Sequence, residues 1–214
     1  YKFLNDKFLY QAKVLDESNT YENLLAMSEE DYDWLLEDIG TSTAWLKPDQ
    51  LIESLHRKQN EATFYETFEN TLNQIAIDNN DIFSVHTDGD TAIRLFDERL
   101  ITDTISDSSK RSEVAKAIIN LLARVKFDET IFSQGFDFFS TLFEYMIKDY
   151  NKDGGGKYAE YYTPHSVAKI IADILVGNDQ PSNVRIYDPS AGSGTLLMNL
   201  ASRIGVDKTT VYSQ

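Results

Sequence analysis

The residues with the clearest capacity for chemistry form one short segment, Asp188-Pro189-Ser190-Ala191-Gly192-Ser193-Gly194-Thr195. It follows the apolar run 184–187 and precedes a stretch with helical spacing, so we predict a turn between a strand and a helix. Gly192 and Gly194 let the backbone adopt positive φ and approach a ligand closely, because no Cβ intervenes. The helix offers free N-terminal amides to a carboxylate or phosphate, and Asp188 can accept hydrogen bonds from an ammonium group. The turn therefore suits a zwitterionic amino-acid group.

The spacing Gly-Ser-Gly does not by itself define the ligand. The six-position glycine fingerprint of dinucleotide-binding proteins is incomplete here, and many strand-to-helix turns contain glycine. No Gly-Lys-Ser or Gly-Lys-Thr follows, so a phosphate loop for nucleoside triphosphates is not expected.

A second segment lies upstream and reads Glu160-Tyr161-Tyr162-Thr163-Pro164-His165. One interpretation is structural: Pro164 occupies the first helical position, Thr163 caps the helix, and His165 is a solvated residue of the first turn. The other is functional, because a pair of tyrosines and a hydroxyl at the end of a loop can wall an adenosine-type ligand. The residues alone leave both interpretations open.

Most of the first 150 residues show helical periodicity. Three stretches carry apolar residues at spacings of three and four, which we interpret as packing faces of core helices and not as cofactor contacts. The first consists of Phe64, Phe68, Leu72 and Ile75. The second, within 112–125, consists of Val114, Ala117, Ile118, Leu121, Leu122 and Val125. The third, within 136–150, consists of Phe139, Leu142, Phe143 and Met146.

The domain organisation follows from a run of three glycines at 154–156. We expect a helical N-terminal domain at 1–150, a glycine-rich linker at 151–157 and the start of a second domain at 158–214. The second domain should contain a helix at about 166–176, a strand at 184–187, a helix at 195–204 and a strand at 209–212. This order opens a doubly wound α/β sheet. Polar segments at 78–81 and 87–90 are predicted loops.

Composition limits the class of protein. With 42% hydrophobic residues among 214, the chain can form a substantial core. The 35 acidic and 20 basic residues give a net charge of −15, so any contact with DNA must be local or shared with a partner. The absence of cysteine excludes thiolate metal sites, Asp88-Gly89-Asp90 lacks the other ligands of a calcium loop, and no metal is expected. No membrane span or signal peptide is evident, and we expect a cytoplasmic protein.

The two segments together resemble a known family. Glu-Tyr-Tyr-Thr-Pro-His and, 24 residues after Pro164, Asp-Pro-Ser-Ala-Gly-Ser-Gly-Thr resemble motifs X and I of the amino-methyltransferases that make N6-methyladenine, in the γ order. The helical region and glycine-rich linker ahead of them are similar to the modification subunit of type I restriction-modification systems. The resemblance implies a mainly α N-terminal domain followed by the start of an α/β Rossmann-like S-adenosylmethionine-dependent methyltransferase domain.

The resemblance also implies roles for individual residues. Glu160, Tyr161, Tyr162, Thr163, Pro164 and His165 would lie along the methionine and adenine end of S-adenosylmethionine, with Thr163 near the carboxylate. Asp188 would face the methionine amino group. Gly192, Ser193, Gly194 and Thr195 would form the turn beneath the cofactor. His165 departs from the pattern, since family members often carry a basic residue such as arginine there.

The catalytic motif of this family, Asn or Asp followed by Pro-Pro and an aromatic residue, is absent from the sequence. The prolines at 48, 164, 181 and 189 are not adjacent, so no catalytic residue is assigned. We expect the sequence to end before the catalytic loop and the acid that binds the ribose, and a chain of these residues alone to be inactive.

The resemblance implies methyl transfer to adenine N6 in DNA, with a specificity subunit and a restriction subunit as partners. Two alternatives are a stand-alone adenine-N6 DNA methyltransferase and a helical interaction module with a non-catalytic α/β remnant.

Overall fold

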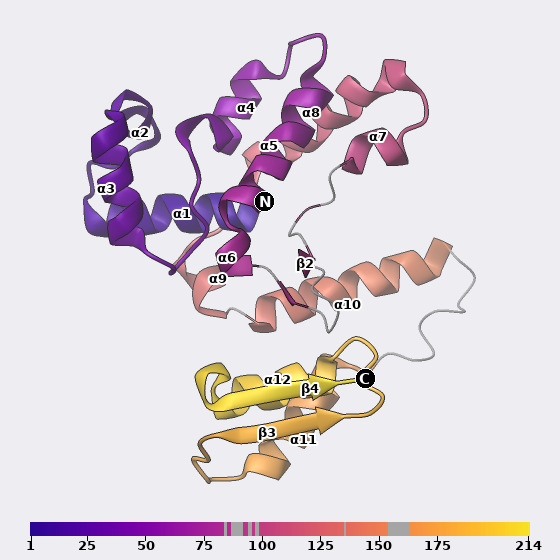
Figure 1. Cartoon of the computed structure of the whole chain (residues 1–214). Helices are drawn as coiled ribbons and strands as arrows, with labels where there is room; N and C mark the ends of the chain where they lie inside the picture. The colour runs from indigo at the N-terminus through magenta and orange to yellow at the C-terminus, as the bar shows by residue number, and fades with distance from the viewer. Residues whose placement is uncertain (84, 87–91, 94–95, 97–98, 135, 154–162) are drawn as a thin grey trace. The chain divides into compact units, whose positions relative to one another are not determined.

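The structure is a computed structural model that describes residues 1–83, 85–86, 92–93, 96, 99–134, 136–153 and 163–214 (Figure 1). The loop 87–90, residues 154–157 of the expected linker, and Glu160, Tyr161 and Tyr162 lie outside the described residues. Two compact units are present, Tyr1–Phe132 and Ser133–Gln214. The domain boundary expected at 151–157 stays a prediction.

The first unit is mainly helical, as its periodicity predicts. Its helices are α1 (Lys2–Leu15), α2 (Tyr21–Ala26), α3 (Glu29–Ile39), η1 (Pro48–Gln50), α4 (Ile52–Lys58), α5 (Phe64–Asp78), α6 (Asn80–Phe83), α7 (Leu100–Thr104) and α8 (Ser108–Arg124). The short strands β1 (Val85–His86) and β2 (Ala92–Ile93) pair antiparallel. Helix α9 (Glu129–Gln134) spans the division between the units.

Side-chain caps explain where several of these helices begin. The Thr20 hydroxyl accepts the amide of Asn23 at the start of α2, and the Ser28 hydroxyl accepts the amide of Asp31 at the start of α3. Asp107 caps α8 by accepting the Ser109 amide at 3.0 Å, and the Ser109 hydrogen bonds lower the pKa of this carboxyl. Short polar side chains at these positions satisfy amides that have no acceptor within the helix.

The core of the first unit confirms one predicted packing face and corrects another. On α5, Phe64, Phe68, Leu72 and Ile75 are buried as expected. On α8 the buried face runs through Ala115 and Ile119, while Leu121 is 63% exposed and Val125 also faces solvent. The predicted face is therefore rotated, because the small side chain of Ala115 faces the core that α8 shares with α4 and α5.

Asn79 fixes the segment before α4 to the end of α5. Its side chain is 1% exposed and accepts the Trp45 amide at 2.6 Å. Its amide group donates to the carbonyls of Trp45 at 2.8 Å and Ile75 at 2.9 Å. The segment 78–81 is thus not the ordinary loop that its polarity predicts: α5 reaches Asp78, α6 follows from Asn80, and a buried amide joins them.

The second unit comprises α10 (Phe136–Asp153), α11 (His165–Val176), β3 (Val184–Asp188), α12 (Thr195–Ile204), η3 (Val206–Lys208) and β4 (Thr209–Ser213). Strands β3 and β4 pair in parallel, with Val184 opposite Thr209 and Asp188 opposite Ser213. The predicted order of helix, strand, helix and strand after residue 163 is confirmed, with bounds that differ by at most one residue.

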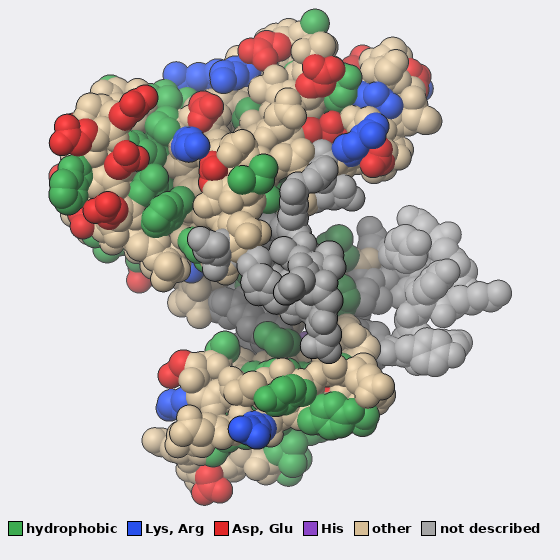
Figure 2. Space-filling model, viewed as in Figure 1, with side chains coloured by type: hydrophobic (Ala, Val, Ile, Leu, Met, Phe, Trp, Pro, Cys, Tyr) green, Lys and Arg blue, Asp and Glu red, His purple; other side chains and the backbone are tan. Residues whose placement is uncertain are grey.

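Helices α11 and α12 pack against one another, and Arg203 joins them by an ion pair with Asp173 and a hydrogen bond to the Gly177 carbonyl. The two helices lie behind β3 and β4 in Figure 1, while Figure 2 shows apolar side chains on the strands' visible face. Within the described ranges, no helix is both long enough and apolar enough to cross a bilayer.

Replacing Asn79 with alanine should lower the free energy of unfolding of the first unit by about 2–4 kcal/mol, because it leaves the partly buried Trp45 amide and carbonyl without these partners. Urea unfolding followed by tryptophan fluorescence measures the change. The neighbouring Ile77→Ala is the control, since Ile77 is largely exposed and its truncation should cost little. Equal effects of the two substitutions would contradict the role given to Asn79.

Candidate functional site

The turn between β3 and α12 has the left-handed backbone that its glycines predict. Gly192 has a φ of +55° and Gly194, the N-cap of α12, has a φ of +73°. The Gly194 amide closes the turn on the Ala191 carbonyl at 2.8 Å. A Cβ built on Gly192 would meet no atom within 4 Å, so the backbone borders open space at this point. Glycine is needed here for its φ, and the space beside it remains available to a ligand.

Strand β4 holds this turn in place. The Gln214 amide donates to the Asp188 carbonyl at 3.1 Å, and the Gln214 carbonyl accepts the Ala191 amide at 3.1 Å. The Tyr187 hydroxyl also donates to the Gln214 side chain at 3.0 Å. The parallel pairing therefore extends past the strands and fixes the first residues of the turn.

Asp188 lies at the carboxyl end of β3, where ligands of parallel sheets bind. It is half-buried, and its Oδ1 accepts the Ser190 amide at 2.9 Å. This hydrogen bond orients the carboxylate and leaves it further acceptor capacity, because a carboxylate offers about four lone-pair positions. The group can receive an ammonium ion.

Helix α12 begins without a side-chain cap. The Met198 amide makes the first hydrogen bond along the helix, to the Gly194 carbonyl at 2.9 Å. The earlier amides of this turn have no acceptor within the helix, and the helix dipole adds partial positive charge beside them. The Ser193 and Thr195 hydroxyls are hydrogen-bonded to each other at 2.8 Å at the same end. The start of α12 therefore suits a carboxylate.

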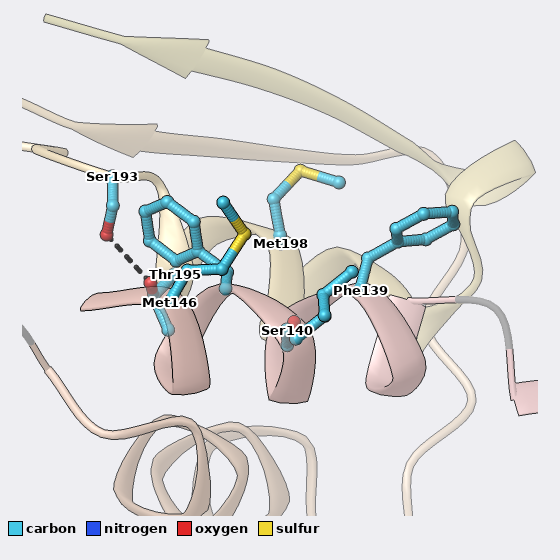
Figure 3. Close-up of a pocket in the computed structure, with 8 residues that line it drawn as sticks. Phe139, Ser140, Met146, Ser193, Thr195 and Met198 are labelled. Carbon is cyan, nitrogen blue, oxygen red and sulfur yellow. Dashed lines mark hydrogen bonds between the residues drawn. The ribbon is translucent and has the colours of Figure 1, made fainter. Parts of the chain in front are cut away.

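A cavity of about 400 Å³ lies between α10 and the start of α12 (Figure 3). Its polar lining includes Ser193 and Thr195 of the turn. The apolar residues of α10 that line it were predicted to be core, and this prediction is wrong: they are 44–60% exposed. They are Phe139, Leu142, Phe143 and Met146. Helical periodicity identifies an apolar face but does not say whether protein or a cavity lies against it.

The predicted site residues border two different cavities. Ser193 and Thr195 line the larger one, whereas Asp188 lines a cavity of about 170 Å³ between β3, α11 and α12. The glycine turn itself connects these residues along the chain. Residues 188–195 thus form one continuous turn, with one cavity beside Asp188 and another beside Ser193 and Thr195.

The start of α11 differs from the sequence prediction. The N-cap is Pro164, not Thr163, and α11 has no side-chain cap of its own. The His165 amide instead donates to the carboxylate of Glu144 on α10. Sequence reasoning missed Glu144 because it lies beside the apolar stripe of α10, where a charged residue is expected to face solvent.

The second unit thus contains a strand, a left-handed glycine turn and an uncapped helix, with a parallel strand beside the first. In α/β proteins with this arrangement, ligands bind at the carboxyl edge of the sheet. Residues 134–213, which contain this unit, match the model of the N-6 DNA Methylase family.

Two curated relatives are methylase subunits of type I restriction enzymes. The MpnII subunit of Mycoplasma pneumoniae is 25% identical over 228 residues, which cover 100% of this chain and 40% of that subunit. The MjaIX subunit of Methanocaldococcus jannaschii is 26% identical over 136 residues, which cover 58% of this chain and 24% of that subunit.

A crystal structure of the type I restriction-modification system methyltransferase subunit from Streptococcus thermophilus has a similar fold. Its TM-score is 0.64 at 23% identity, with 100% of this chain and 45% of that chain covered. The chain thus spans about 40% of the length of the MpnII subunit. The expected relationship is confirmed: the chain is related to the methylase subunits of type I restriction enzymes, with the N-6 DNA methylase match in residues 134–213.

Replacing Gly192 with alanine should destabilise the second unit by about 1 kcal/mol, because the left-handed backbone is strained for a residue with a Cβ although space is available. Gly192→Asn should cost less, since asparagine tolerates this conformation best among other residues. Hydrogen exchange of amides in 184–204 measures both. An alanine variant as stable as the glycine protein would contradict the assigned backbone.

Proposed function

We propose that the second unit begins a Rossmann-like, S-adenosylmethionine-dependent methyltransferase domain. The protein to which this chain belongs would transfer a methyl group to adenine N6 in DNA, as the modification subunit of a type I restriction-modification complex. The observation that carries this proposal is the open glycine turn after Asp188, within the segment that matches N-6 DNA methylases.

The residues of the turn fit the amino-acid end of S-adenosylmethionine. The Asp188 carboxylate would accept the ammonium group, and the uncapped amides at the start of α12 would receive the carboxylate. Gly192 would allow the cofactor to lie against the backbone, since a Cβ there would project into the open space. Ser193, Gly194 and Thr195 complete this side of the site.

The upstream segment supplies the opposite side. Thr163 would approach the cofactor carboxylate, next to Pro164 and His165 at the start of α11. Glu160, Tyr161 and Tyr162 precede them in sequence and would extend along the cofactor toward its adenine. The cavity beside Ser193 and Thr195 has a size typical of small-molecule sites, which supports a ligand at this end of α12.

The role of these residues is binding and orientation. When bound, S-adenosylmethionine supplies an electrophilic methyl group for direct transfer, without a metal. The described residues hold its amino-acid end, and a rigid turn lowers the entropic cost of placing the methyl group. No residue of this chain is assigned a catalytic role.

The partners follow from the same proposal. DNA, a specificity subunit and a restriction subunit would complete the complex. The net charge of −15 supports DNA binding that is shared with a partner subunit. An acidic chain needs basic surface elsewhere in the assembly to neutralise DNA phosphates.

Replacing Asp188 with alanine in the full-length protein should weaken binding of S-adenosylhomocysteine by at least about tenfold, because the ammonium group loses a charge-assisted hydrogen bond. Isothermal titration calorimetry measures the affinity. Asp179→Ala removes the same charge from an exposed residue outside the turn and should leave the affinity unchanged. Equal binding by the Asp188 variant and the parent protein would rule out this assignment.

Methyl transfer provides the test of the reaction. The full-length protein, together with its specificity subunit, should transfer labelled methyl groups from S-adenosylmethionine to DNA. Nucleoside mass spectrometry should identify the product as N6-methyladenine. Methyl groups found only on RNA or protein would overturn the proposed substrate.

A further inference from the structure

We propose that Glu144 is a positioning residue of the cofactor site, which caps α11 from a different helix and so leaves the Thr163 hydroxyl to the cofactor. The inference rests on the proposed function, because it assigns a role to a residue outside both motifs. Glu144 lies on α10, 21 residues before His165, and its carboxylate accepts the His165 amide.

The start of α11 takes a hydrogen-bond acceptor from another helix. The first amides of a helix lack acceptors within it, and a serine, threonine, asparagine or aspartate at the N-cap normally supplies one. Here the N-cap is Pro164, whose side chain has no acceptor. The carbonyl of Pro164 accepts the amides of Val167 and Ala168, and the Glu144 carboxylate accepts the His165 amide. A carboxylate is also favoured there by the helix dipole.

Thr163 directly precedes the N-cap of α11. It is the nearest local residue able to cap α11, and capping would turn its hydroxyl toward the helix amides. The Glu144 carboxylate accepts the His165 amide, and no residue next to α11 in sequence caps it with a side chain. Thr163 therefore does not serve as the cap. Because the Thr163 hydroxyl is not used to cap the helix, it can bind the cofactor carboxylate as the proposed function requires.

Helix α10 gains a polar contact with the rest of the second unit through Glu144. Its apolar stripe lines a cavity and is about half exposed, so apolar packing alone holds the helix weakly. The half-buried Glu144 adds a charge-assisted hydrogen bond to the start of α11. The match to the N-6 DNA Methylase family begins at residue 134, just ahead of α10, so this helix belongs to the shared pattern.

Three substitutions of Glu144 in the full-length protein distinguish the effect of its side-chain length from the effect of its negative charge. Glu144→Gln keeps the length and an acceptor oxygen, so its affinity for S-adenosylhomocysteine should stay within about threefold of the parent. Glu144→Asp keeps the charge but is one methylene shorter, and Glu144→Ala removes the acceptor. Both should weaken binding by about tenfold, equivalent to about 1.4 kcal/mol. They should raise the KM for S-adenosylmethionine while kcat at saturation is retained.

Hydrogen exchange gives a readout that does not require the cofactor. The amides of 165–168 should exchange faster in the aspartate and alanine variants and as in the parent protein in the glutamine variant. Glu113→Ala removes an exposed acidic group from α8 in the first unit and should change neither exchange nor affinity. Unchanged exchange in both Glu144→Asp and Glu144→Ala would overturn the capping role.

A double-mutant cycle with Thr163→Val tests the link to the cofactor. If Glu144 acts through Thr163, the double variant Glu144→Ala with Thr163→Val should bind little more weakly than the worse single variant. Fully additive losses would overturn this link. A parent protein that fails to bind S-adenosylhomocysteine would reject the proposed function. Normal parent binding with normal binding by both Glu144→Asp and Glu144→Ala would reject the positioning role alone.

Discussion

The left-handed backbone between β3 and α12 is the constraint on which the candidate site depends. At Gly192 and Gly194 the chain leaves the strand and enters the helix in a conformation that residues with a Cβ adopt only at a cost. This conformation directs the uncapped amides of α12 toward the carboxyl edge of the sheet, near the end of the strand that carries Asp188. The open space beside Gly192 is a consequence of the same geometry.

Backbone hydrogen bonds and side-chain burial both stabilise this arrangement. Among the described residues, the core that β3 shares with α12 contains three buried apolar side chains, Ile186, Leu197 and Ala201. The turn, in contrast, is tied to the end of β4 by two backbone hydrogen bonds through Gln214. Because β4 pairs with β3 and continues into Gln214, the position of β4 fixes the turn that follows β3. The shape of the site therefore depends on β4, although β4 contributes no proposed ligand contact.

Sequence could predict the parts of the site that are contiguous along the chain. A strand, two glycines and a helix start within 184–204 follow from local conformational preferences, and so do the caps at Thr20, Ser28 and Asp107. Contacts between distant segments could not be predicted this way. The sequence indicated no role for Glu144 and predicted that Asn79 lies in a loop, because the partners that give each its role lie 21 and 34 positions away. The buried face of α8 also depends on contacts with distant segments. The helix has more than one apolar face, and the helices that pack against it determine which face is buried.

The apolar stripe of α10 shows how binding and stability can be linked. A face that borders a cavity buries little apolar area, so α10 gains less from the hydrophobic effect than a core helix of its length would. A ligand that binds the folded unit and not the unfolded chain adds stability by mass action. Segments that meet at the site, α10, the start of α11 and the turn before α12, would therefore be the ones most stabilised when a ligand binds. In the described structure, the His165 amide at the start of α11 is bonded to Glu144 of α10, and the turn before α12 is bonded to Gln214 at the end of β4. These hydrogen bonds orient the backbone of the site without filling the space beside it.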